Sequence, residues 1–93
     1  MENLSIEKRR NNKQLEVILK GRLDGNGAWE LLNDLKDNCA DIDEVVIQTK
    51  FLGNPCLFGK RMVLNHLYFL DRPLNVLDAD RDSHRIIIQF TNN

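Results

Sequence analysis

The chain has 93 residues, of which 42% are hydrophobic and 29% charged, and its formal net charge at pH 7 is −1. This length suits one domain with one hydrophobic core, and the composition is too apolar for a disordered chain. A protein that follows nucleic-acid phosphates needs a cationic surplus, so the charge argues against nucleic acid as a partner. No apolar stretch approaches the roughly 20 residues that cross a bilayer, and two cysteines do not make the dense framework of a small secreted fold. We therefore expect a single cytoplasmic domain over residues 1–93, with both thiols free and no membrane partner.

The first predicted element is a β-hairpin. Leu4 and Ile6 alternate with polar residues, and residues 10–13 supply a turn, because asparagine tolerates positive φ. From residue 15 to 20, apolar side chains recur with a period of two, which is typical of a half-buried strand. This strand is expected to end at residues 21–24.

A helix is expected next, after the chain break at Gly25-Asn26-Gly27. Asn26 or Gly27 is the expected N-cap. One face carries apolar residues at helical spacing, namely Ala28, Leu31, Leu32, Leu35 and Cys39. Trp29 lies beside this stripe, a position that suits either the margin of the core or a binding hot spot.

The second half of the chain predicts a strand, a helix and two more strands. The β-branched run 45–47 predicts a central strand buried on both faces. A helix is expected from about residue 56 to residue 70, and Pro73 guarantees its end. Its inward stripe consists of Gly59, Met62, Val63, Leu67 and Leu70. Residues 74–77 and 86–90 predict two further strands, and the sequence leaves open whether these two pair with each other.

The order β-β-α-β-α-β-β alternates strands and helices, which implies crossover connections and partly parallel pairing. Two helices can cover only one face of a five-stranded sheet well. The expected fold class is therefore α/β, a two-layer sandwich in which a mixed sheet of about five strands has its helices mainly on one face.

The apolar strand that closes in Gly21-Arg22-Leu23-Asp24, followed by a helix that begins with small residues, resembles the opening of a STAS domain. The second apolar strand at 45–47 and the Phe51-Leu52 pair after it also suit that family, which includes the bacterial anti-sigma factor antagonists. The resemblance is best over residues 4–52. It implies a protein-binding, regulatory role in bacterial signalling.

Beyond Leu52 the chain departs from the family in two ways. Members that are switched by phosphorylation carry Asp-Ser-Ser-Gly at the next position, whereas residues 53–56 here are Gly-Asn-Pro-Cys. No serine can accept phosphate there, which disfavours a kinase-controlled switch. The family also usually has a helix beside its final strand, whereas only residues 78–83 separate the last two strands here. A shortened member would leave sheet uncovered, and exposed apolar sheet is normally hidden by a partner or a second copy.

Catalytic chemistry is disfavoured by the sequence. A nucleophilic site would need Cys56 or Ser83 near His66 or His84, oriented by a carboxylate. No oxyanion loop or glycine-rich fingerprint accompanies them, so a small helix-start cysteine and an exposed helical histidine are the simpler interpretation. We therefore expect the protein not to be an enzyme.

Neither metals nor cofactors are expected. The cysteines and histidines lack metal-binding spacing. The acidic stretches 41–44 and 78–82 lack the glycine and distal glutamate of a calcium loop.

A basic cluster surrounds the predicted hairpin turn and consists of Lys8, Arg9, Arg10 and Lys13. Such a cluster could meet acidic partners or phosphates. No aromatic residue is interleaved, so a platform for stacking nucleic-acid bases is missing. Cations that keep a sheet edge soluble are the simpler interpretation.

Apolar residues outside the inward stripe of the second helix, Phe58, Leu64 and Tyr68, indicate a contact surface, although a helix buried on two sides fits equally well. In anti-sigma factor antagonists the signature loop and the helix after it face the partner. The resemblance therefore implies partner binding through loop 53–56 and the outer face of helix 56–70, by Asn54, Phe58, Arg61, Asn65 and Tyr68. The expected function is a non-enzymatic protein-interaction module. The alternative is a small structural protein, of phage or mobile-element origin, that forms a homodimer through the same surface.

Overall fold

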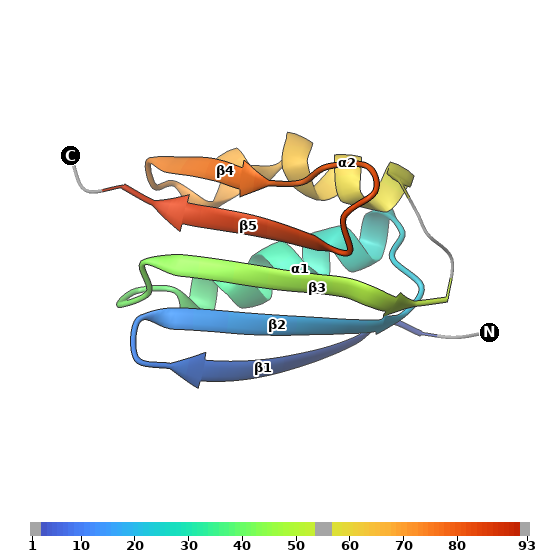
Figure 1. Ribbon diagram of the computed structural model, residues 1–93, viewed down its shortest axis with the longest axis horizontal. Coiled ribbons are helices and arrows are strands. Elements are labelled where there is room, and N and C mark those ends of the chain that lie inside the picture. Colours follow the sequence, from blue (N-terminus) through green and yellow to red (C-terminus); the bar gives the residue numbers. More distant parts are fainter. Residues whose placement is uncertain (1–2, 54–56, 92–93) are drawn as a thin grey trace.

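The protein is a two-layer α/β sandwich, as the sequence predicts. The computed structural model describes residues 3–53 and 57–91. In Figure 1 a five-stranded mixed sheet forms one layer, and the helices lie together behind it. The strands are β1 (Ser5–Asn11), β2 (Gln14–Gly21), β3 (Glu44–Leu52), β4 (Leu74–Asp78) and β5 (Arg85–Phe90). The helices are α1 (Gly25–Asn38), α2 (Leu57–Asn65) and a 3-10 turn, η1 (Leu67–Leu70).

The strand order across the sheet is β1-β2-β3-β5-β4. Only β2 and β3 run parallel, joined by the crossover through α1, and the other neighbouring pairs are antiparallel. The last two strands form a hairpin, which answers the question that the sequence leaves open. Its second strand, β5, returns between β3 and β4, so that Val45 lies opposite Ile88.

The hairpin β1–β2 follows from its turn residues. Asn11 pairs with Gln14, and Asn12 between them has a φ of 56°, the left-handed conformation that asparagine tolerates. The turn prediction for residues 10–13 is confirmed.

The N-cap of α1 is Asp24, and the prediction of Asn26 or Gly27 is wrong. Asp24 has extended backbone angles, and its carboxylate Oδ1 accepts a hydrogen bond of 2.8 Å from the backbone N–H of Gly27. A carboxylate at this position satisfies an otherwise orphaned donor and suits the positive end of the helix dipole. The helix therefore begins at Gly25, three residues earlier than a Gly27 cap would place it.

The central strand β3 is longer than the predicted 45–47, and it is buried on one face only. Val45 and Ile47 are fully buried beneath the helices, whereas Val46 and Gln48, which point to the other face, are only partly buried. The reason is that both helices cover the same side of the sheet, which leaves the second side uncovered.

The predicted helix 56–70 is interrupted. Regular α-helix ends at Asn65, and the 3-10 turn η1 continues to Leu70, where Asp71 adopts a left-handed conformation with a φ of 54°. Arg72 then precedes Pro73, and a residue before proline is disfavoured in helical conformation.

One core cluster lies between the layers. It joins the inward residues of α1 with those of β2, β3 and β5 and with Val63, Leu67 and Leu70. Leu64 packs against this cluster and is partly buried, so the expectation that it points outward is wrong. No helix among residues 3–53 and 57–91 is long and apolar enough to cross a membrane.

Candidate functional site

A cluster of aromatic side chains lies on the helical layer, where α1 meets the end of α2 and η1. The ring of Trp29 on α1 lies 4.8 Å from the ring of His66 and 5.2 Å from that of Phe69, centroid to centroid. The ring of Tyr68 lies 6.0 Å from His66. We call Trp29, His66, Tyr68 and Phe69 the aromatic cluster.

The helix break after Asn65 positions the histidine of this cluster. His66 Nδ1 lies 2.7 Å from the carbonyl oxygen of Met62, one of the acceptors left without a helical partner at the end of α2. A carbonyl can only accept, so Nδ1 carries the hydrogen and donates it. The ring is thereby held against Trp29, and the same turn directs Tyr68 outward.

Exposure divides the cluster into a base and a tip. Tyr68 is 73% exposed and Trp29 is 37% exposed, whereas Phe69 is partly buried and packs against the core. The ammonium group of Lys36 lies 4.6 Å from the centroid of the Phe69 ring, within range of a cation–π contact. The cluster is therefore held to the core through Phe69, and it presents Tyr68, Trp29 and the neighbouring Lys36 cation to solvent.

The structure places three of the five predicted partner-binding residues on the surface. Arg61, Asn65 and Tyr68 are exposed, and residues 61 and 65 are one turn apart on α2, so they share a helix face. Asn54 lies outside the described residues, as does the side chain of Phe58.

The sequence pattern marks Trp29 and Tyr68 as surface candidates but does not indicate that His66 and Phe69 are their neighbours. Phe69 belongs to a helix end whose inward stripe ends at Leu70, and His66 has the appearance of an ordinary exposed polar residue. No local signal could have joined them to Trp29, because the contact depends on how α1 packs against η1.

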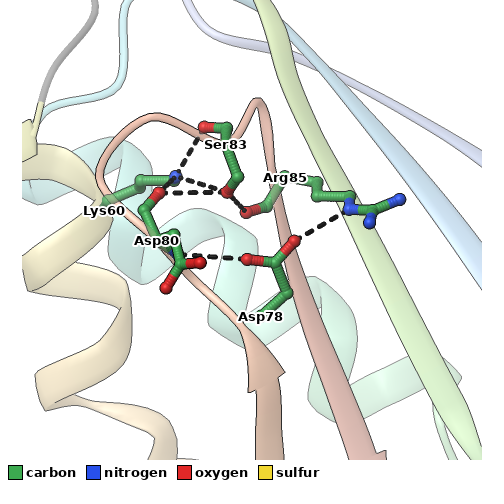
Figure 2. A network of polar contacts seen from close by, with 5 residues as sticks. All are labelled: Lys60, Asp78, Asp80, Ser83 and Arg85. Atoms are coloured by element: carbon green, nitrogen blue, oxygen red, sulfur yellow. Dashed lines mark hydrogen bonds and ion pairs between the residues drawn. The ribbon is translucent and has the colours of Figure 1, made fainter.

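A second polar feature lies at the other end of α2, where Lys60 reaches the loop between β4 and β5. Its side chain is buried, with 6% exposed, and its ammonium group donates to the carbonyl oxygens of Asp80 and Ser83, both at 2.9 Å, and to Ser83 Oγ at 3.3 Å. Figure 2 shows how these acceptors surround the nitrogen. Beside it, Arg85 Nε donates to Asp78 Oδ2 at 2.9 Å.

The contact between Lys60 and Ser83 has the composition of a serine–lysine nucleophile pair, but its hydrogen bonds run the wrong way. Lys60 donates to two carbonyl oxygens, which requires hydrogens on its nitrogen, and the Ser83 hydroxyl is directed at the carbonyl oxygens of Asp80 and Arg85, 3.0 and 2.9 Å away. A general base needs an open lone pair facing the nucleophile. The network ties the loop to α2 and is structural.

The titration of Asp78 belongs to the same network. Its pKa is held below the ordinary value by the hydrogen bond from Arg85, and further by the backbone N–H of Asp80. Both donors favour the ionised carboxylate.

Among the described residues no group of three histidine, cysteine, aspartate or glutamate side chains could hold a metal ion, so the acidic loop is not arranged as a metal site there.

An open depression of about 490 Å³ lies at the start of α1, lined in part by Arg22, Asp24, Asn26 and Glu30. The Asp24 carboxylate already caps the helix there. With one cation facing two carboxylates, the depression favours no charge class of ligand.

Comparison of the chain with protein-family models, with curated proteins and with solved structures finds no match.

Proposed function

We propose that this protein is a non-enzymatic protein-interaction module that binds a partner protein through the outer surface of α2 and η1 together with Trp29. The observation that carries this proposal is the exposed Tyr68, anchored through His66 to a half-exposed Trp29. Tryptophan, tyrosine and arginine are the residue types most enriched among binding hot spots, and Arg61 lies on the same helical layer.

The preorganised base of the cluster supports this role physically. Rings that already pack against each other and against the core lose little conformational freedom when a partner covers them. Arg61 and Asn65 would flank the aromatic contact with polar groups, as the rim of an interface does. The STAS-like pattern of residues 4–52 favours a regulatory module of the bacterial cytoplasm. The sequence Gly-Asn-Pro-Cys at 53–56 favours one without control by serine phosphorylation.

The proposal is tested by photo-crosslinking in extracts of the native cell. p-Benzoylphenylalanine in place of Tyr68 should capture a distinct protein, and the same group in place of Gln89, on the helix-free face of the sheet, should not. Capture should fall at least about tenfold when Arg61→Ala is added, because a hot-spot side chain is worth at least about 1.4 kcal/mol. Capture that is equal from both faces, or unchanged by Arg61→Ala, would discard the proposed surface.

A second copy of the chain is the other occupant to be considered. Size exclusion with light scattering, at protein concentrations from about 1 to about 100 micromolar, distinguishes a monomer with a free surface from a homodimer. A dimer that Tyr68→Ala converts to monomer would replace the partner-binding proposal with homo-oligomerisation through the same surface.

A further inference from the structure

The two edges of the sheet differ in their capacity to accept another strand. At one edge β4 has only five residues, and its pairing with β5 shifts register between Val76 and Asp78. A short edge with a bulge is poorly suited to continuous pairing. At the other edge β1 has seven residues that pair with β2 in unbroken register, and no ribbon lies beyond it in Figure 1.

The β1 edge is strongly cationic. Lys8, Arg9 and Arg10 are consecutive and exposed, and Lys13 follows in the turn. Lys8 forms an ion pair of 2.6 Å with Asp34 of α1. The guanidinium groups of Arg9 and Arg10 have no carboxylate within ion-pair distance among the described residues; Arg10 donates instead to the backbone oxygen of Asn12.

These cations lie on both faces of the strand. Lys8 and Arg10 are opposite Val17 and Leu15, whose side chains are buried under the helices, and Arg9 is opposite Glu16 on the uncovered face. An added strand would therefore meet positive charge on each of its faces, since alternate side chains of neighbouring strands lie side by side.

From this arrangement we propose that β1 is a docking edge for an extended acidic segment of a partner protein, which adds to the sheet as a further strand. Main-chain hydrogen bonds to the open edge of β1 supply affinity. Carboxylates opposite Lys8, Arg9 and Arg10 supply selectivity. Two copies of β1 repel each other, because each carries three cations and one carboxylate, so the same charges that select an acidic strand exclude self-pairing.

The probe is a fluorescein-labelled peptide of eight residues in which pairs of glutamates alternate with valine–threonine pairs, so that each face of an added strand carries carboxylates. Its binding is measured by fluorescence anisotropy. The wild-type protein should bind it, and should bind a matched peptide with glutamine in place of glutamate at least about tenfold more weakly. Two further peptides keep every glutamate but carry N-methyl groups on alternate amides. In one the methyl groups block the N–H groups along one edge of the peptide strand, and in the other they block those along the opposite edge. One version should lose at least about tenfold in affinity, because it lacks the main-chain donors that strand addition uses.

Protein variants locate the site. The double variant Arg9→Glu, Arg10→Glu should lose the acidic peptide and gain a peptide with lysine in place of glutamate. The control Lys50→Glu, Arg81→Glu changes net charge equally at exposed positions away from β1, and it should bind the acidic peptide within about threefold of wild type. Circular dichroism establishes that each variant is folded.

Three results would overturn the proposal. These are the absence of binding to the acidic peptide, equal binding of both N-methylated versions and the unmodified peptide, or equal losses in the two charge-reversal variants. The peptide comparisons use the wild-type protein, so they decide the question even if a variant fails to fold.

Discussion

The ammonium nitrogen of Lys60 lies 2.9 Å from the carbonyl oxygen of Ser83 and thereby fastens the first half of α2 to the loop between β4 and β5. A second bond of the same length reaches Asp80 in the same loop. Both acceptors are main-chain oxygens, so a buried cation is satisfied without a carboxylate. Because burying a charge is costly unless it is fully hydrogen-bonded, the loop and the helix depend on each other.

Replacement Lys60→Met should destabilise the fold by about 1–3 kcal/mol, because it removes the hydrogen bonds that the Lys60 ammonium group donates to the carbonyl oxygens of Asp80 and Ser83. The measurement is the free energy of unfolding in urea. Hydrogen exchange should also show loss of protection around residues 79–84. The control Lys50→Met, at an exposed position on β3, should change stability by less than about 0.5 kcal/mol. Equal stability of the two variants would contradict a structural role for the Lys60 network.

Acid stability should depend on Asp78. Its folded-state pKa is depressed, chiefly by the hydrogen bond from Arg85, so the ionised form favours folding. This contribution is complete above the unfolded pKa of about 4 and is lost as the pH falls through the lower folded value. Asp78→Asn should therefore lower stability at pH 7 and should flatten its decline below about pH 4.

Thermal unfolding between about pH 2 and pH 7 measures this effect. Asp37→Asn serves as the matched control, because Asp37 is exposed on α1 and belongs to neither ion pair found among the described residues. If Asp78→Asn and the wild type lost stability in parallel as the pH fell, the pair Asp78–Arg85 would have no part in acid unfolding.

The local elements were predictable because their patterns are short-range. The alternation from Leu15 to Leu19 and the helical spacing from Ala28 to Leu35 each concern one face of one element, and the structure buries those faces. The N-cap of α1 is not predictable in this way, because Asp24, Asn26 and Gly27 are all acceptable caps. The backbone conformation of the residues after β2 decides which of them caps the helix, and a local sequence pattern does not specify that conformation.

Relationships between distant elements were not predictable. The strand β5 lies between β3 and β4, and nothing in the β-branched run 86–88 distinguishes that position from the sheet edge. The same limit hid the contact between Trp29 and His66 and the burial of Lys60. A lysine on a helix is ordinarily solvated, and only the fold of the loop 79–84 over it makes this one buried.

Replacement of Arg72 by lysine should lower the stability of the fold. Its guanidinium group donates to the carbonyl oxygens of Cys39 and Ile42, beyond the end of α1, and its central carbon lies 4.0 Å from the centroid of the Phe90 ring. A planar fork can make two such bonds while it stacks on a ring, whereas an ammonium group cannot. Arg72→Lys should cost about 1–2 kcal/mol, measured by urea unfolding, and Arg61→Lys at an exposed position should cost almost nothing. Similar small effects at both positions would show that charge alone suffices.

Helix propensity and packing make opposite predictions for Gly59. Glycine inside a helix is about 1 kcal/mol less favourable than alanine, so propensity alone predicts that Gly59→Ala stabilises the protein. A Cβ at this position would lie 2.7 Å from the backbone oxygen of Leu23 and 2.8 Å from the Cγ of the same residue. Backbone cannot move aside cheaply, so overpacking should prevail, with a net loss of about 1–3 kcal/mol.

Gly25 provides the comparison for this substitution. A Cβ there would lie 3.2 Å from the terminal methyl carbon of Met62, which is the flexible end of a side chain. Gly25→Ala should therefore be neutral, or stabilising by up to about 1 kcal/mol. Urea unfolding of the two variants tests whether the close approach of α2 to Leu23 fixes the position of α2 in the helical layer. A stabilised Gly59→Ala would mean that α2 can move away from Leu23 without penalty, and the aromatic cluster at its far end would then lack a rigid support.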